Sequence, residues 1–179
     1  MRHGLPGWIA TALCAAVLLA GCAAVPKGGP EVKLSEGILV AASAWENVAA
    51  GGWKDFPPEK TLDGDLSKLS SWRAEAEDHG QWIRYDLGAV RAITRLRIAF
   101  LQGDSRVYRF DIELSADGRR WSKVFSGTNT GATADFETFD LGDRPARYVR
   151  LTGYGNRAIE GESKFPKWFN IVETEIYGY

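Results

Sequence analysis

Short runs in which apolar and polar residues alternate constrain the fold of this chain more than any other feature. The run TRLRIAF places Leu96, Ile98 and Phe100 on one face of an extended strand and the residues between them on the other. The run RYVRLTG does the same with Val149 and Leu151. Each run therefore predicts a strand with one buried and one solvated face.

Turn-forming residues separate these runs at short intervals, and the pair Asp117-Gly118 is typical of a hairpin tip because glycine tolerates positive φ. No apolar pattern of helical period follows residue 22, and no internal repeat or βαβ alternation is present. The pattern predicts an all-β sandwich. The expected strands span residues 36–43, 81–87, 92–101, 107–115, 120–127, 134–141, 146–153 and 170–178.

Composition fits one soluble domain and argues against nucleic acid as a partner. The chain has 179 residues, of which 45% are hydrophobic and 25% charged. Its formal net charge of −1 offers no basic footprint for phosphates. The seven tryptophans are unusually many for this length, so some of these rings are candidates for ligand contact.

The N-terminal segment predicts export and lipid attachment. Arg2 and a short apolar run form a signal peptide, and the run ends in Leu-Ala-Gly-Cys at Cys22. This phrase resembles the lipobox of bacterial lipoproteins, which implies acylation of the Cys22 thiol. Ala23 after it implies sorting to the outer membrane in a Gram-negative cell envelope. The alternative is an ordinary signal peptide with an incidental cysteine.

The domain organisation follows from that segment. Residues 1–21 are expected to be the lipoprotein signal peptide, and residues 22–34, rich in Pro, Gly and small residues, a flexible tether. Residues 35–179 are expected to form one β-sandwich domain.

Four ordered phrases in that domain, TLDGDL, QWIRYDLG, SADGRRW and ARYVRLTG, are similar to those of a known family. The chain resembles the coagulation factor 5/8 type C, or discoidin, domain, and within it the bacterial branch of family 32 carbohydrate-binding modules. The resemblance implies an eight-stranded antiparallel jelly-roll sandwich of the galactose-binding-like type. It also implies binding loops clustered at one end and, often, a structural calcium ion. Function depends on the loops, so the fold alone does not name the ligand.

The stretch TLDGDLSKLSSW is the candidate calcium loop, because it places carboxylates, carbonyls and hydroxyls at short spacing. It lacks the glycine and the final acidic residue of an EF-hand. Against the family pattern it carries two extra residues before Trp72, which must bulge outward if the site survives. The alternative is an acidic loop whose Asp side chains hold their own turn. The expected ligands are Leu62, Asp63, Asp65, Ser70 and, by resemblance, Glu173 of the last strand, with Glu175 as its alternative.

Loops rich in aromatic and polar residues are the candidate sugar site. Sugar sites combine an aromatic platform with a few directed polar groups, and guanidinium groups pair with carboxylates through two hydrogen bonds. The cations in these loops therefore favour an acidic polysaccharide, such as a uronic-acid polymer. The expected ligand-binding residues are Trp45, Asn47, Trp53, Arg106, Tyr154, Asn156 and Trp168. In contrast, Trp72, Trp82 and Trp121 lie in or beside strands and are expected in the core.

Catalysis is not expected. His79 and Cys22 are the only His and Cys outside the signal segment, which excludes a Cys-His side-chain pair and a zinc cluster of His residues. The acidic residues Glu75, Glu77 and Asp78 are neighbours in a loop, where a solvated cluster is the simpler interpretation. We therefore expect a non-catalytic carbohydrate-binding module anchored to a bacterial envelope. The alternatives are a protein- or lipid-binding adhesion module and a purely structural domain of an envelope complex.

Overall fold

The computed structural model describes residues 29–46, 55–76, 79–162 and 166–179. Strands dominate these ranges, with a short 3-10 helix, η1 (Pro58–Thr61), on the way to the third strand. No helix of the described part is long and apolar enough to cross a membrane. The strands are β1 (Val32–Lys33), β2 (Leu39–Ala42), β3 (Trp72–Glu75), β4 (Gln81–Phe100), β5 (Arg106–Ser115), β6 (Ser122–Thr128), β7 (Glu137–Ala158) and β8 (Trp168–Gly178).

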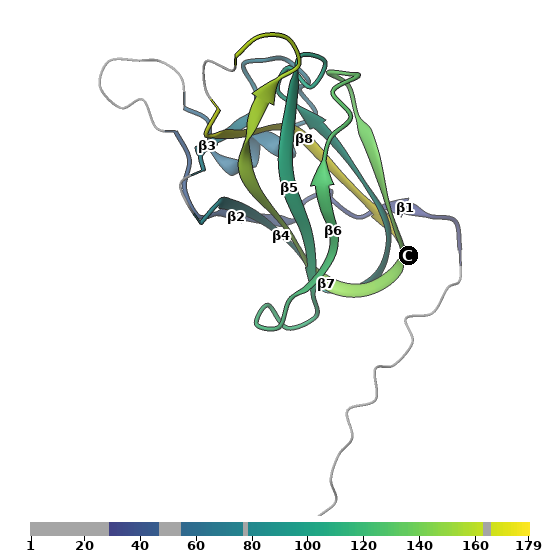
Figure 1. Cartoon of the computed structure of the whole chain (residues 1–179). Coiled ribbons are helices and arrows are strands. Elements are labelled where there is room, and N and C mark those ends of the chain that lie inside the picture. Colours follow the sequence, from purple (N-terminus) through teal and green to yellow (C-terminus); the bar gives the residue numbers. More distant parts are fainter. Residues whose placement is uncertain (1–28, 47–54, 77–78, 163–165) are drawn as a thin grey trace, which may run out of the picture.

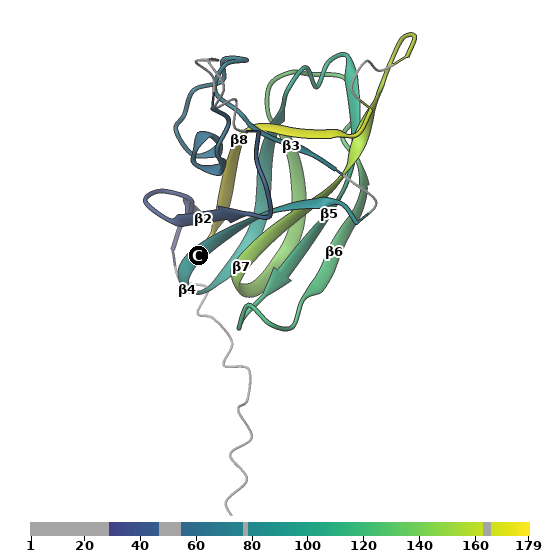
Figure 2. The same ribbon diagram turned by 90° about the vertical axis from the view of Figure 1, so that its left-hand side faces the viewer.

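Two long strands, β4 and β7, build the two layers of the sandwich because each runs through both (Figures 1 and 2). In one layer the first half of β4 pairs with β2 and with the second half of β7, and β5 and β6 follow. In the other layer the second half of β4 pairs with β8 and with the first half of β7. Strands β1 and β3 pair with β8. All of these pairings are antiparallel, so the predicted all-β, eight-stranded antiparallel fold is confirmed.

Two pairs of expected strands are continuous in the structure. The strands expected at residues 81–87 and 92–101 form β4, and those expected at residues 134–141 and 146–153 form β7, because β4 and β7 both bend between the layers. The register of β4 and β7 shifts between Asp86 and Arg91, and pairing then resumes with Arg91 opposite Ala146. Arg147 donates to both carboxylate oxygens of Asp86 at 2.7 and 2.8 Å, which ties the strands together at the bend. The two strands therefore turn together instead of ending in loops.

Strands β1 and β3 were not expected from the sequence, and β1 lies within the predicted tether. The Leu34 N–H donates to the Ile176 carbonyl at 2.7 Å, and Arg95 forms an ion pair with Glu31 at 2.6 Å. These contacts bring residues before Leu34 into the sheet. Part of the segment predicted to be a tether is therefore a strand of the sheet.

The core confirms the alternation read from the sequence, with one correction. Leu96, Ile98 and Trp72 are fully buried. Trp82 and Trp121 are only half-buried, so their expected place in the core is wrong. Each ring lies on the solvated side of its layer and is covered by a cation. The Arg84 guanidinium lies 5.8 Å from the Trp82 ring and the Arg150 guanidinium 4.0 Å from the Trp121 ring.

The Phe169 ring is the centre of the aromatic core. It contacts the rings of Trp72, Phe100, Tyr108 and Phe110, with centroids 5.8 to 6.4 Å apart. Space for it comes from Gly153 on β7, where an added Cβ would lie 1.9 Å from the Phe169 Cγ. The glycine is therefore required by a close approach of side chain to backbone.

We expect Gly153→Ala to lower the free energy of unfolding by about 1–3 kcal/mol or more, because the new methyl group overlaps the Phe169 ring. Urea unfolding followed by tryptophan fluorescence measures this loss. The double variant Gly153→Ala/Phe169→Leu gives the methyl group room and should be less destabilised than the sum of the two single variants. Equal stability of Gly153→Ala and wild type would contradict the packing described.

Candidate functional site

A cleft of about 280 Å³ opens at the end of the sandwich where β4 turns into β5. The turn at Leu101–Ser105, the first residues of β5 and β8, and strand β3 surround it. The buried Tyr108 lies beneath the turn and donates its hydroxyl to the Leu101 carbonyl at 2.7 Å. The lining residues are Glu46, Lys68, Arg73, Leu101, Gln102, Arg106, Trp168 and Asn170.

Two of the predicted ligand residues, Arg106 and Trp168, meet in this cleft. Arg106 is the first residue of β5 and Trp168 the first of β8, so each is held by a strand rather than by a free loop. Trp168 is half-buried and leaves part of its ring accessible. The pair supplies an apolar surface next to a guanidinium group.

Arg73 is a second guanidinium of the cleft, and its position is tightly fixed. Its Nε donates to the Ser71 hydroxyl at 2.9 Å, and its Nη2 donates to the Lys68 carbonyl at 2.7 Å. The group also lies 3.7 Å from the centre of the Phe56 ring. Burial lowers the pKa of Arg73, and the nearby Glu46 carboxylate partly offsets that shift. An arginine has five N–H donors, so several remain for a ligand.

Asn170 and Gln102 are the uncharged polar residues that line the cleft. Asn170 is 3% exposed, yet its side-chain oxygen has no hydrogen-bond partner among the described residues. A buried acceptor without a partner is costly, and a donor from a ligand in the cleft would satisfy it. Gln102 has φ of 55°, a backbone conformation that is unfavourable for residues other than glycine. Such strain is concentrated at functional sites.

The electrostatics of the cleft favour an anionic ligand. The lining contains three cationic side chains, those of Lys68, Arg73 and Arg106, and one carboxylate, that of Glu46. The described lining contains no His, Cys or Ser, and Glu46 is its one carboxylate. The arrangement can bind and orient a ligand with an apolar face and a negative group.

The other predicted ligand residues lie elsewhere. Tyr154 and Asn156 line a separate hollow on the outer face of β5 and β7. Trp45 is 45% exposed next to Glu46 but does not line the cleft. Asn47 and Trp53 fall outside the described residues, as does Cys22.

Sequence reasoning missed six lining residues, the apolar Leu101 and the polar Glu46, Lys68, Arg73, Gln102 and Asn170. Arg73 follows the buried Trp72 in a short strand that carries no readable alternation. Asn170 is enclosed between Phe169 and Ile171, a context that predicts core. The turn LQGDSR holds both Gln102 and the predicted Arg106, so its polar composition was the available signal.

The candidate calcium loop lies against the last strand, but both of its Asp side chains also form local contacts. The Asp63 Oδ1 accepts from the Asp65 N–H at 2.9 Å, and the Asp63 Oδ2 lies 3.5 Å from the Lys60 Nζ. The Gly64 N–H donates to the Glu173 carboxylate at 3.1 Å, so the loop and the last strand meet. The Ser70 hydroxyl donates to Asp63 at 2.5 Å. Both carboxylate oxygens of Asp65 instead accept from Ser67, through its N–H and its hydroxyl. Asp65 therefore holds its own turn, which was the alternative interpretation.

The extra residues before Trp72 bulge outward. Leu66 and Leu69 are 47% and 61% exposed, whereas Ser70 and Ser71 are buried. The insertion therefore leaves Asp63, Ser70 and Glu173 near one another. The alternative ligand, Glu175, is engaged in ion pairs with Lys33 and Arg97 at 3.2 and 2.6 Å.

Glu173 has the environment of a carboxylate that lacks a counterion. It is 2% exposed, and burial followed by the nearby Asp63 charge raises its pKa to about 7, against a backbone hydrogen bond from Gly64 that lowers it. A cation between Asp63 and Glu173 would offset both the burial of the Glu173 charge and its repulsion from Asp63. The two carboxylates and an oxygen of Ser70 therefore fit a hard metal ion. Among the described residues no group of three or more His, Cys, Asp or Glu side chains has metal-binding geometry. Carbonyl oxygens, such as that of Leu62, would have to complete the set.

Comparisons with known proteins agree with this architecture. A family 32 carbohydrate-binding module of AlyQ, solved in complex with 4,5-unsaturated mannuronic acid, is 34% identical, with a TM-score of 0.64 over 77% of this chain and 92% of that one. A pectin-binding module is 22% identical, with a TM-score of 0.64 over 77% of this chain and 88% of that one. The family 32 module of C. perfringens NanJ, in complex with galactose, is 15% identical, with a TM-score of 0.63 over 83% of this chain and 99% of that one.

A curated relative and a family assignment complete the comparison. The BTB/POZ domain-containing protein 9 of Drosophila melanogaster is 29% identical over 100 residues, or 46% of this chain. The match spans only 14% of that protein's length. The F5/8 type C domain family matches residues 41–169, which include β3 to β7 and the start of β8. The chain therefore belongs to the F5/8 type C domain family.

Proposed function

We propose that this protein is a non-catalytic binding module that holds an acidic polysaccharide, of the uronic-acid class, in the cleft of Arg73, Arg106 and Trp168. The observation that carries the proposal is the combination of two guanidinium groups, an accessible tryptophan and an unpartnered buried acceptor in one hollow. The AlyQ module, at 34% identity, was solved with an unsaturated mannuronic acid, which is an acidic sugar, and this supports the ligand class.

Each group of the cleft has a separate part in binding. The Trp168 ring offers a flat surface for the apolar face of a pyranose. The guanidinium groups of Arg73 and Arg106 match the geometry of a carboxylate, which a lysine would meet only as a point charge. The Asn170 oxygen accepts from a sugar hydroxyl and thereby gains the hydrogen bond that it lacks. No bond of the ligand is broken in this account.

We expect Trp168→Ala and Arg106→Ala each to weaken binding of an oligomannuronate or oligogalacturonate by about tenfold, because each removes a contact of about 1.5 kcal/mol or more. Isothermal titration calorimetry measures the affinity. Added salt should weaken binding by wild type and have a smaller effect on Arg106→Ala.

The matched control is Trp121→Ala, which removes another half-buried tryptophan from the outer face of the sheet. It should bind like wild type. If wild type binds no uronate oligomer but captures a protein or lipid headgroup, the alternative of an adhesion module is correct.

We also propose that a calcium ion, held by Asp63, Glu173 and oxygens of Leu62 and Ser70, braces the loop before β3. When bound, the ion supplies positive charge to two adjacent carboxylates and no chemistry toward the sugar. The support is the buried Glu173 carboxylate with its raised pKa and the Asp63 side chain beside it.

The raised pKa predicts how stability depends on pH in the presence of chelator. Glu173 has a pKa of about 7 in the folded protein against an ordinary 4.5. Its contribution to the free energy of unfolding is therefore complete below pH 4.5 and is lost as the pH rises through 7. Calcium in 100-fold excess over its Kd should raise the free energy of unfolding at neutral pH by about 3 kcal/mol.

Thermal melts with chelator and with calcium across that pH range test both effects. Glu173→Gln should remove the pH-dependent loss and the calcium shift together. Asp65→Asn, which removes a carboxylate bound to Ser67 in the same loop, is the matched control and should keep most of the shift. Melting that ignores chelator, calcium and Glu173→Gln would overturn the proposal.

We further propose that the Cys22 thiol carries a lipid that anchors the domain to a bacterial envelope, in the outer membrane of a Gram-negative cell. The Leu-Ala-Gly-Cys phrase after the apolar run supports it. Cells expressing the full chain with labelled palmitate should incorporate label and hold the protein in the membrane fraction, and Cys22→Ala should do neither. Label retained by Cys22→Ala would contradict attachment at this residue.

A further inference from the structure

A second hollow, of about 250 Å³, lies on the outer face of the layer that contains β5, β6 and β7. It is separate from the cleft, and β5, β7 and the residues before β8 line it. Its walls are formed mainly by Val107, Arg109, Thr128, Tyr154, Arg157 and Pro166.

The two arginines of this hollow have no acidic partner within the described ranges. Arg109 and Arg157 are both exposed, and neither forms an ion pair with a residue of the described part. Other cations of the same face are paired. Lys123 lies 2.6 Å from the Asp111 carboxylate, and Arg150 donates to both oxygens of Glu113 at 2.8 and 2.9 Å. The positive charge of the hollow is therefore available to a ligand.

Tyr154 gives the hollow an aromatic wall of fixed orientation. Its hydroxyl donates to the buried Asp111 carboxylate at 2.8 Å, and the Arg109 guanidinium lies 4.8 Å from the ring centre. An aromatic ring beside guanidinium groups is the combination that the cleft presents with Trp168 and its arginines. The two hollows thus suit the same chemical class of ligand.

One short backbone segment separates the second hollow from the cleft. Pro166 lines the second hollow and Trp168 lines the cleft. Asn156 holds this segment from β7, because its N–H donates to the Pro166 carbonyl and its side-chain nitrogen to the Trp168 carbonyl, both at 2.7 Å. Gly155 permits the contact, since an added Cβ would lie 2.3 Å from the Pro166 oxygen. The two hollows are therefore rigidly joined.

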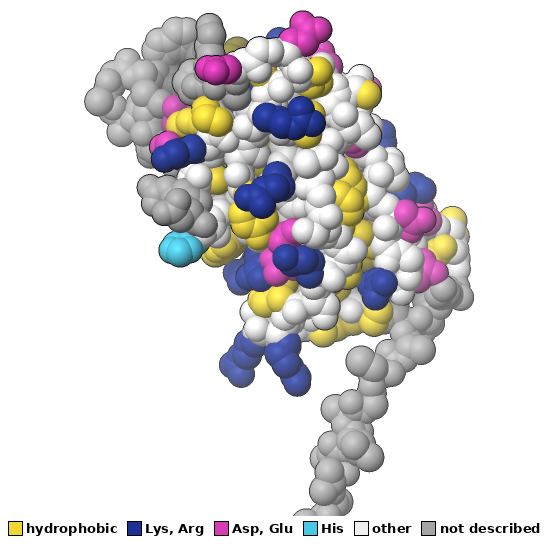
Figure 3. All heavy atoms as spheres, in the orientation of Figure 1, with side chains coloured by type: hydrophobic (Ala, Val, Ile, Leu, Met, Phe, Trp, Pro, Cys, Tyr) yellow, Lys and Arg dark blue, Asp and Glu magenta, His cyan; other side chains and the backbone are white. Residues whose placement is uncertain are grey.

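We propose that the hollow of Arg109, Tyr154 and Arg157 is a second subsite that binds further uronate residues of the acidic chain held in the cleft. The inference rests on the proposed function and deepens it, because it predicts recognition of a stretch of polymer rather than of one sugar. The positive charges of Arg109 and Arg157 complement the negative charges of a polyanion. Lys and Arg side chains are also spaced along this face with hydrophobic patches between them (Figure 3).

The test is a chain-length series by isothermal titration calorimetry with mannuronate oligomers from the disaccharide to the hexasaccharide. Wild-type affinity should rise with length by about tenfold, because the longer chains reach the second pair of guanidinium groups. The double variant Arg109→Ala/Arg157→Ala should bind the disaccharide like wild type and lose that gain. Both side chains are exposed, so the variant should remain folded.

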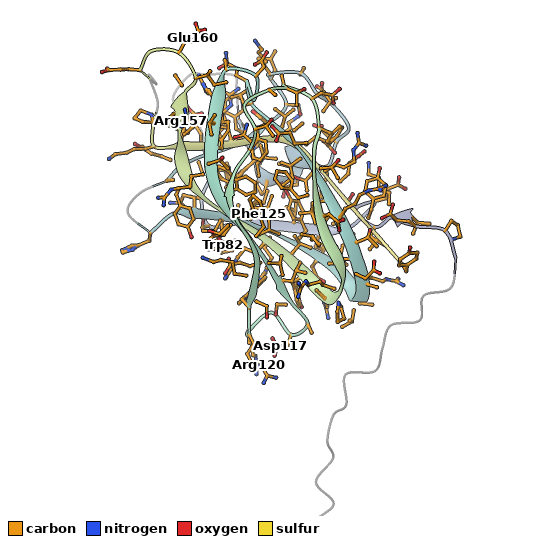
Figure 4. The ribbon with its side chains drawn as sticks, turned by 45° about the vertical axis from the view of Figure 1, so that its right-hand side comes forward. Trp82, Asp117, Arg120, Phe125, Arg157 and Glu160 are labelled. Carbon is orange, nitrogen blue, oxygen red and sulfur yellow. The ribbon has the colours of Figure 1, made fainter. Side chains whose placement is uncertain are left out.

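The matched control is Arg119→Ala/Arg120→Ala, which removes the same charge from the β5–β6 hairpin at the opposite end of the molecule from Arg157 (Figure 4). It should keep the full gain with length. A wild-type affinity that does not depend on length, or equal losses in the two double variants, would overturn the subsite while leaving the cleft proposal intact. Weaker disaccharide binding by Arg109→Ala/Arg157→Ala would also overturn it, by placing these arginines in the primary site. Failure of wild type to bind any oligomer would instead overturn the proposed function and the subsite with it.

Discussion

The packing of the Phe169 ring against Gly153 is the contact on which the rest of the structure depends. The ring fills the space that a side chain on β7 would occupy, and it contacts four other aromatic rings from β3, β4 and β5. It thereby joins β8 to both layers of the sandwich. Burial of such rings is a dominant source of stability in a domain of this size.

The packing of Phe169 against Gly153 also determines the geometry of the cleft. Trp168 and Asn170 are the chain neighbours of Phe169, so the buried ring fixes the strand from which both line the site. Tyr108, which stacks in the same cluster, supports the Leu101 turn from below. A rigid apolar base thus presents a few polar groups that the fold does not satisfy. This preorganisation lowers the ordering cost of binding a ligand.

The sequence predicted the scaffold better than the site, for physical reasons. Alternation in β4 and β7 reports burial directly, so the faces of Leu96 and Val149 were predictable. Trp82 and Trp121 were misplaced because an aromatic ring covered by arginine has the same sequence signature as one in the core. Arg106 and Trp168 were found from loop composition. Arg73 and Asn170 were not, because only the tertiary contact of β3 with β8 brings them together.

The proposed function requires that the guanidinium groups of Arg73 and Arg106 and the ring of Trp168 form one uronate-binding cleft. The most direct measurement is a titration of the protein with a mannuronate oligomer, followed by NMR of the assigned arginine and tryptophan side-chain N–H groups. We expect the signals of Arg73, Arg106 and Trp168 to shift together with a single affinity, while the indole signal of Trp121 does not move. Shifts confined to Trp82 and Trp121, with the cleft signals unchanged, would contradict it.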